Sequence, residues 1–358
     1  MPSGTPPTIC RFIRAPPPSR WWGRSCWSSS TQEAEVPEAV RTRVAVVQAS
    51  PHFFDTPSAV DEVVARTAEA AGGGAGLVVF PEAYVGGYPW GLAFGTAVGG
   101  RSPAGRRTWQ RYHEAAIDVP GPETARMGEA AAAHGVTLVV GVVERDSTFS
   151  GGTLFCTLLY FGPDGALMGK HRKLKPTAAE RLIWGEGDGS TMPVFDTPVG
   201  RLGGLICWEN YMPLARMAMY GQGVQVYVAP TADARPRWQS TLQHIAIEGR
   251  CFVLGCNQFV TRDMYPDDLE LAHELDAWPD VLCVGGSAIY GPMGDLLAGP
   301  LEGEAGIVSA EIDPDDLVRA KFDFDVTGHY ARPDVFRFDV DTRRRPPVTY
   351  DRARRDDP

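Results

Sequence analysis

Three residues able to take part in nucleophilic chemistry follow apolar runs of the chain. Cys207 follows "GGLI", Glu82 follows "LVVFP", and Lys173 lies in "GKHRKLKPTAAE". A thiol becomes a nucleophile when a base removes its proton or when positive charge lowers its pKa. A carboxylate can be that base if burial raises its own pKa, and an ammonium stabilises negative charge on the attacked group. Together these residue types predict attack of a cysteine on an electrophilic carbon.

Each of the three residues also has an ordinary structural explanation. A cysteine at the end of an apolar strand is commonly a small buried side chain. A glutamate after a proline is commonly solvated or caps a helix, and a lysine among basic residues is commonly a surface charge. The chemical interpretation requires that the three strand ends meet at one edge of a sheet, where side chains leave the core and can face one cavity.

The elements that must position these residues alternate along the chain. Strands are predicted at 42–50, 76–82 and 136–144, helices at 58–71, 124–135 and 236–250, and hairpins at 153–173 and 285–300. The combination of hairpins with strand–helix–strand crossovers predicts an α/β sandwich with mixed sheets. No linker interrupts this pattern, so residues 41–340 are expected to form one domain.

Composition limits the classes of partner. The chain has 358 residues, 44% of them hydrophobic and 22% charged, which is ordinary for a globular protein. A formal net charge of −10 argues against nucleic acid or an anionic membrane surface as a partner. No apolar run is long enough to span a bilayer.

The seven cysteines predict a reducing compartment. Their odd number, mostly within apolar runs, does not resemble a disulfide framework, so a cytoplasmic protein is expected. Cys251 and Cys256 lack a second Cys or His pair at ligand spacing, and no metal site is expected there.

Both ends of the chain differ from its middle. Residues 1–40 are rich in Pro, Ser, Arg and Trp, and their first acidic residue is Glu33. They are expected to be either a disordered extension or upstream sequence included by a start codon placed too early; their prolines argue against the helix of a transit peptide. Residues 341–358 are polar and expected to be a flexible tail.

Three longer stretches resemble the catalytic blocks of a known family. "FPEAYVGGYPWG", "GKHRKLKPTAAERLIWGEGDGS" and "GGLICWENYMPLARMAMYGQG" are similar, in order and wording, to those of the nitrilase branch of the carbon–nitrogen hydrolase superfamily. The likeness extends over about residues 42–340. The Cys-Trp-Glu sequence resembles the nitrilase form, and "NYMPL" resembles the group of plant-type and bacterial arylacetonitrile or aliphatic nitrilases.

The resemblance implies a role for each matching position. Cys207 is expected to be the nucleophile, Glu82 the general base and Lys173 the electrostatic stabiliser. Glu180 is expected to be an accessory acid that positions the lysine and the reacting water. Lys175 is a rival for Lys173, but the "HRKL" wording favours Lys173.

Residues beside these positions receive further predictions. The backbone N–H of Trp208 is expected to stabilise developing negative charge. Trp208 and Tyr84 are predicted to bind substrate, although core packing explains most aromatic residues of these blocks equally well. Glu209 is expected to be structural, because adjacent side chains diverge in such a segment.

The resemblance also implies a fold and an activity. The fold is a four-layer αββα sandwich with two mixed β-sheets. The activity is hydrolysis of an organic nitrile by water to the carboxylic acid and ammonia, with no metal or organic cofactor. Family members pair into dimers and often extend into spirals or filaments, so a homo-oligomer is expected.

Alternative functions stay open at this point. They are an amidase or carbamoylase, a cyanide-converting enzyme, and, from a different class, a non-catalytic scaffold protein. The nitrile itself is also open among arylacetonitriles, aliphatic mono- or dinitriles and β-cyanoalanine.

Overall fold

The computed structural model describes residues 41–349. The expected N-terminal extension, residues 1–40, therefore lies outside the described residues, as do residues 350–358 of the expected tail. Residues 341–349 carry no helix or strand. Within 41–349, no helix combines the length and the apolar character needed to cross a membrane.

The first of two large sheets has six strands in the order β15-β1-β2-β5-β6-β7. Their bounds are β1 Thr42–Gln48, β2 Ala75–Val79, β5 Thr137–Arg145, β6 Leu154–Phe161, β7 Leu167–Arg172 and β15 Gly306–Ile312. The pairs β1–β2 and β2–β5 are parallel, whereas the pairs β5–β6, β6–β7 and β1–β15 are antiparallel. The sheet is therefore mixed, and β6–β7 is the hairpin expected from the Pro-Asp-Gly turn.

The second sheet has seven strands, six of them in the order β12-β13-β11-β10-β9-β8, with β14 added beside β13. Their bounds are β8 Val194–Thr197, β9 Gly200–Gly204, β10 Val226–Pro230, β11 Phe252–Cys256, β12 Phe259–Thr261, β13 Val281–Tyr290 and β14 Leu296–Glu302. β9, β10 and β11 are parallel, and the outer pairs are antiparallel.

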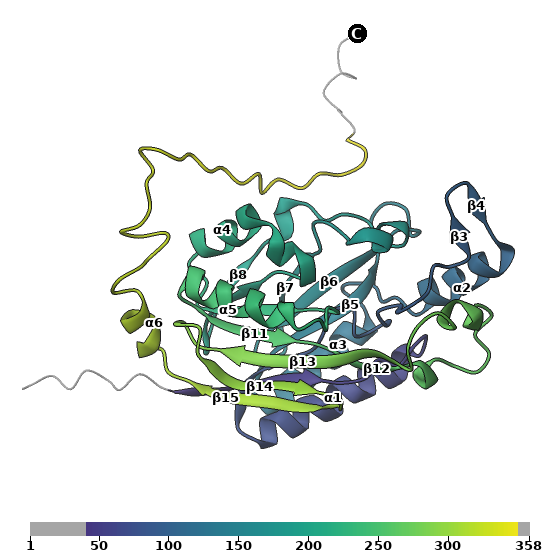
Figure 1. Cartoon of the computed structure of the whole chain (residues 1–358), viewed down its shortest axis with the longest axis horizontal. Helices are drawn as coiled ribbons and strands as arrows, with labels where there is room; N and C mark the ends of the chain where they lie inside the picture. The colour runs from purple at the N-terminus through teal and green to yellow at the C-terminus, as the bar shows by residue number, and fades with distance from the viewer. Residues whose placement is uncertain (1–40, 350–358) are drawn as a thin grey trace, which may run out of the picture. The chain divides into compact units, whose positions relative to one another are not determined.

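Helices cover the outer face of each sheet. The helices are α1 Thr56–Gly72, α2 Pro103–Glu114, α3 Pro122–His134, α4 Pro213–Gly221, α5 Arg237–Gly249 and α6 Asp315–Ala320. Apolar side chains of α1 and α3 pack on the first sheet, and those of α4 and α5 pack on the second. Figure 1 shows α4 and α5 above β11 and β13, and α1 below these two strands. α2 and the short β3–β4 hairpin (Thr96–Ala97, Gly100–Arg101) lie in the excursion between β2 and α3.

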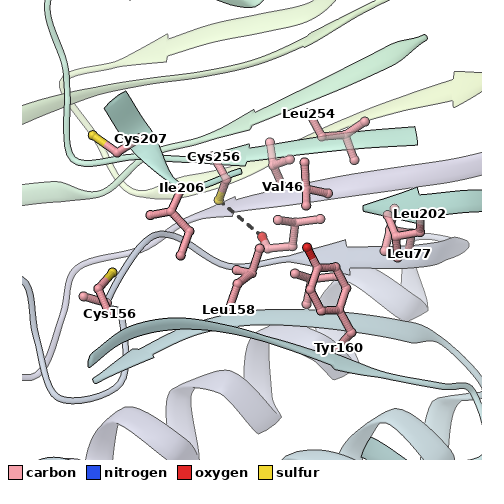
Figure 2. Packing of buried hydrophobic residues seen from close by; sticks show 14 of the residues in the cluster. Val46, Leu77, Cys156, Leu158, Tyr160, Leu202, Ile206, Cys207, Leu254 and Cys256 are labelled. Carbon is pink, nitrogen blue, oxygen red and sulfur yellow. Dashed lines mark hydrogen bonds between the residues drawn. The ribbon is translucent and has the colours of Figure 1, made fainter. Parts of the chain in front are cut away.

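The inner faces of the two sheets meet in an apolar core (Figure 2). Val46, Leu77 and Leu158 from the first sheet face Leu202 and Leu254 from the second, and all five are fully buried. Burying one such side chain contributes about 1.5–3 kcal/mol to folding. Two helical layers outside two packed sheets make the four-layer αββα sandwich, which confirms the expected fold class.

Candidate active site

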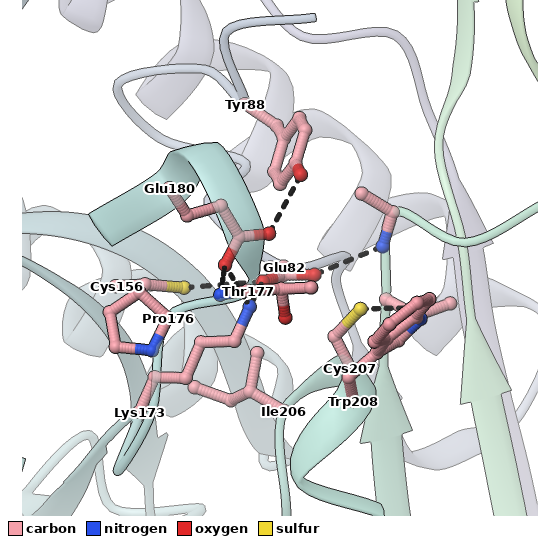
Figure 3. Close-up of polar contacts among 12 residues, drawn as sticks. Glu82, Tyr88, Cys156, Lys173, Pro176, Thr177, Glu180, Ile206, Cys207 and Trp208 are labelled. Carbon is pink, nitrogen blue, oxygen red and sulfur yellow. Dashed lines mark hydrogen bonds and ion pairs between the residues drawn. The ribbon is translucent and has the colours of Figure 1, made fainter. Parts of the chain in front are cut away.

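Four of the predicted residues come together where strands of both sheets end (Figure 3). Glu82 follows β2 and Lys173 follows β7 directly, both in the first sheet. Cys207 follows β9 of the second sheet. Glu180 lies in a 3₁₀ turn, Ala178–Leu182, beyond Lys173. By contrast, Lys175 lies at the surface and pairs with Glu186.

Lys173 joins the two carboxylates. Its Nζ donates hydrogen bonds to Glu82 Oε1 at 2.6 Å and to Glu180 Oε2 at 2.7 Å. Burial by itself would lower the pKa of Lys173, but the charges of Glu82, Cys207 and Glu180 raise it well above its ordinary value. Lys173 is therefore an ammonium throughout the neutral range and supplies a fixed positive charge inside the site.

Glu82 has the properties of a general base. Burial raises the pKa of its carboxyl group to about 7, with Lys173 opposing the shift and Glu180 adding to it. The backbone N–H of Ala232 donates to Oε2 at 3.0 Å, and the Cys156 thiol donates to Oε1 at 3.6 Å. A carboxylate with a pKa near neutrality can both take and return a proton in one catalytic cycle.

Cys207 opens a 3₁₀ turn, Cys207–Tyr211, with a left-handed φ of 51°. A non-glycine residue in this region costs about 1–3 kcal/mol, a cost found mainly at functional sites. Burial and the Glu82 carboxylate raise the pKa of the thiol well above its ordinary value, so the resting group is a thiol and needs a base. The Thr231 hydroxyl donates to Sγ at 3.1 Å and favours the thiolate once the proton leaves.

Glu180 is held in place by three donors. In addition to Lys173, the backbone N–H of Thr177 donates at 2.6 Å and the Tyr88 hydroxyl donates at 2.7 Å. Burial and Glu180 raise the pKa of Tyr88 well above its ordinary value, so its phenol keeps the proton that it donates. The carboxylate therefore has a fixed orientation beside the lysine.

The backbone near Glu82 depends on a glycine in the neighbouring strand. A Cβ at Gly141 in β5 would lie 2.0 Å from the Pro81 carbonyl oxygen and 2.9 Å from the Glu82 Cα. Only glycine allows this close approach, and it fixes where Glu82 leaves the sheet. Ala83 then turns the chain with a left-handed φ of 47°.

A cavity of about 420 Å³ opens at Cys207. Its walls are largely aromatic and apolar, with a few polar groups: Tyr88, Trp90, Thr177, Glu180, Trp208, Ala232, Asp233, Ala234, Arg235, Trp278, Leu282 and Val284. Trp208, predicted to bind substrate, is held there by an indole N–H donated to Asp233 at 2.9 Å. The Arg235 guanidinium lies 4.8 Å from the centre of the Trp208 ring.

Tyr84 does not reach this cavity, which corrects its predicted contact with substrate. Its side chain is fully buried beneath α1 and α3, with its ring centre 5.5 Å from that of Phe80. The cause is the turn at Ala83, after which Val85 bridges to β5 and Tyr84 faces the helices. Tyr88 from the same block lines the cavity instead.

Thr231 and Cys156 contact the site but were not among the residues predicted from the sequence. Thr231 is the first polar residue after the apolar strand β10. Glu82 and Cys207 were predicted because they also follow apolar strands, so the same criterion would have found Thr231. Cys156 lies inside β6 and carries no comparable signal. Among residues 41–349 no group of three or more His, Cys, Asp or Glu side chains is placed to hold a metal ion.

Comparison with known proteins identifies the family to which this chain belongs. A family model described as carbon–nitrogen hydrolase matches residues 43–322. A bifunctional nitrilase/nitrile hydratase of Lupinus angustifolius is 53% identical over 320 residues, which cover 88% of this chain and 90% of the relative. An aliphatic nitrilase of Sinorhizobium fredii is 52% identical over 301 residues, covering 84% and 95%.

Solved structures support the fold at lower identity. A carbon–nitrogen hydrolase from Helicobacter pylori matches with a TM-score of 0.61 and 19% identity, covering 78% of this chain and 92% of its own. A Nesterenkonia amidase of the nitrilase superfamily matches with a TM-score of 0.58 and 19% identity, covering 81% and 97%. The family model and the close relatives place the chain more narrowly: it belongs to the carbon–nitrogen hydrolase family, within its nitrilase branch.

Proposed function

We propose that the protein hydrolyses an organic nitrile to its carboxylic acid and ammonia through a covalent intermediate on Cys207. The observation that carries the proposal is the buried cluster in which Lys173 joins Glu82 and Glu180 beside the Cys207 thiol. These groups provide a nucleophile, a base and a positive charge at one cavity.

The first half of the reaction forms a thioimidate. Glu82 takes the proton of Cys207, and Sγ attacks the nitrile carbon while one C–N π pair moves onto nitrogen. Lys173 and the backbone N–H of Trp208 stabilise that negative nitrogen, and Glu82 returns the proton to it. The product is a C=N–H group bonded to sulfur.

The second half consumes two waters. Glu82, with Glu180 orienting the lysine and the water, deprotonates the first water as it adds to the thioimidate carbon. The C–N bond breaks, protonated nitrogen leaves as ammonia, and a thioester remains. The second water cleaves the C–S bond, releasing the acid and the thiol. If the C–S bond breaks before ammonia leaves, the product is the amide.

The cavity favours a nitrile with an apolar or aromatic group. Trp90, Trp208 and Trp278 supply flat apolar walls close to Cys207. A second cavity, of about 370 Å³, shares Tyr88, Trp90, Glu180 and Trp278 with the first and offers space for a longer substituent. An amidase reaction on the same groups is the alternative, but the relatives near 50% identity carry nitrilase names.

Ammonia release from a matched panel tests the proposal. The purified protein is assayed with phenylacetonitrile, an aliphatic nitrile, a dinitrile and β-cyanoalanine, each beside its amide, and with cyanide alone. We expect at least one nitrile to exceed its amide in kcat/KM. Faster hydrolysis of every amide, or turnover of cyanide alone, would assign the alternative activities.

We further propose a homo-oligomer in a reducing, cytoplasmic compartment, with residues 41–340 as the catalytic domain. The five cysteines within 41–349 are all free and buried, as expected where thiols stay reduced. Leu214 on α4 and Phe322 after α6 are 67% and 89% exposed, which favours burial against another copy. Light scattering should give a mass that is at least twice the 38.8 kDa of one chain.

A further inference from the structure

One carboxylate outside the cavity contacts both catalytic loops. Glu209 is almost fully buried, and its Oε2 accepts the backbone N–H of Ile206 at 2.7 Å. Its Oε1 accepts the backbone N–H of Leu174 at 2.6 Å. Ile206 directly precedes Cys207, and Leu174 directly follows Lys173. Glu209 therefore joins the nucleophile turn of one sheet to the lysine loop of the other.

His171 on β7 completes this connection. Its Nδ1 lies 2.5 Å from the Thr191 carbonyl oxygen, and its Nε2 lies 3.0 Å from Glu209 Oε2. A carbonyl oxygen can only accept, so Nδ1 carries a hydrogen. Both Glu209 oxygens already accept backbone N–H groups, so Oε2 is also the acceptor toward the ring and Nε2 carries a hydrogen as well. Two ring N–H groups define an imidazolium.

The charges on this pair are mutually dependent. Burial by itself would lower the pKa of His171, but the Glu209 carboxylate and the Thr191 carbonyl raise it above its ordinary value. Both side chains are inaccessible to solvent. Removing one partner of such a pair leaves a buried charge without compensation, which is strongly unfavourable.

We propose that the His171–Glu209 ion pair fixes the position of the Cys207 turn relative to Lys173, and that both are positioning residues for the reaction. Neither residue lines the cavity at Cys207. Catalysis requires Sγ to stay in register with Glu82 and Lys173, because a misplacement of about 1 Å can cost on the order of 100-fold in rate. This inference rests on the proposed function, which supplies the reaction that the two residues would serve. Their positions rest on the hydrogen bonds described above.

Glu209→Gln is the first test. A glutamine oxygen can accept from only one of the two loops, because its NH₂ group then faces the other backbone N–H. We expect kcat for the best nitrile to fall about 30- to 100-fold with KM within about twofold. The matched control is Glu144→Gln, which removes an equally buried carboxylate paired with Lys170 and Arg172. It should destabilise the fold comparably and keep kcat within about twofold.

Two variants of His171 separate the contacts of its ring. In His171→Asn the amide nitrogen replaces Nδ1 and the contact with Glu209 is lost. In His171→Gln the amide nitrogen replaces Nε2 and can still donate to Glu209. We expect His171→Gln to retain several-fold more kcat than His171→Asn. We also expect the double variant Glu209→Gln/His171→Asn to be no slower than Glu209→Gln, because residues acting as a unit are not additive.

A second readout keeps this inference separate from the proposed function. The rate at which iodoacetamide alkylates Cys207 in the folded protein requires no nitrile, and Glu209→Gln should slow it about tenfold while Glu144→Gln does not. If the wild type hydrolysed no nitrile but alkylation followed this pattern, the function would fail and the positioning role would stand. Wild-type kcat and alkylation in Glu209→Gln, or multiplicative losses in the double variant, would overturn the inference.

Discussion

Burial gives the ionisable groups of the site different roles. Burial raises the pKa of Glu82 to about 7 and raises that of Cys207 well above its ordinary value, so Cys207 stays a thiol. The neighbouring carboxylates raise the pKa of Lys173, so the lysine stays charged. Only Glu82 among the three changes its protonation near neutral pH. In the proposed reaction, Glu82 can therefore take the thiol proton and return it, while Lys173 keeps its charge.

The first expected consequence is an acid limb in the pH profile. The pKa of Glu82 is raised, so its basic form prevails above about pH 7 and is lost as the pH falls below that value. We expect kcat/KM to fall about tenfold per pH unit below pH 7. Glu186→Gln, which removes an exposed carboxylate beside Lys175, should leave the profile unchanged. A flat profile down to pH 5 would show that Glu82 is not the base.

Strand ends bring the proposed catalytic residues together. Glu82 and Lys173 leave the first sheet, whereas Cys207 and Thr231 leave the second, so the site lies where the two sheets meet. Gly141 in β5 lets the Glu82 segment lie against the sheet. The turns after β2 and β9 both use left-handed backbone, at Ala83 and at Cys207.

Gly141→Ala tests this close approach. A methyl group there would meet the Pro81 carbonyl at 2.0 Å, so the Glu82 segment must move. We expect kcat to fall on the order of 100-fold while the circular dichroism spectrum is kept. Gly72→Ala makes the same change at the end of α1, where a Cβ meets nothing within 4 Å, and should behave as wild type. Equal activity of the two variants would refute the argument.

The sequence was sufficient for elements with a strong local pattern. The apolar runs of β1 and β2 and the Pro-Asp-Gly turn of β6–β7 predict those elements within a few residues. The polar α2 was not predicted, nor was the pairing of β15 with β1, because the former lacks an apolar stripe and the latter is a contact between distant segments. The orientation of Tyr84 could not be predicted for a local reason. The alternation of side chains along a strand does not reveal the left-handed turn at Ala83, which points the Tyr84 side chain toward the helices.

At the scale of the whole molecule, the apolar core between the two sheets holds the loops of the site in position relative to one another. Each loop with a proposed catalytic residue is anchored on one sheet, and side chains such as Leu158 and Leu254 pack between the sheets and set their distance. The family membership and the fold agree at this scale, because the family model covers residues 43–322, which include both sheets.

Leu254→Ala tests the role of this core. Removing a fully buried leucine should lower the free energy of unfolding by about 2–5 kcal/mol, as measured by chemical denaturation. The remaining folded protein should keep kcat within about twofold, since Leu254 does not line the cavity. Val98→Ala, at a fully exposed side chain, should change stability by no more than about 0.5 kcal/mol. Similar stabilities of the two variants would contradict the assignment of the core.

Cys207 is proposed to form the covalent intermediate of the reaction. The most direct measurement is ammonia release by Cys207→Ala with the best nitrile, together with intact-mass spectrometry of acid-quenched protein. We expect a folded variant with no ammonia above background and no adduct, whereas the wild type should turn over and carry the added acyl mass. Ammonia release by Cys207→Ala at a rate near that of the wild type would contradict this proposal.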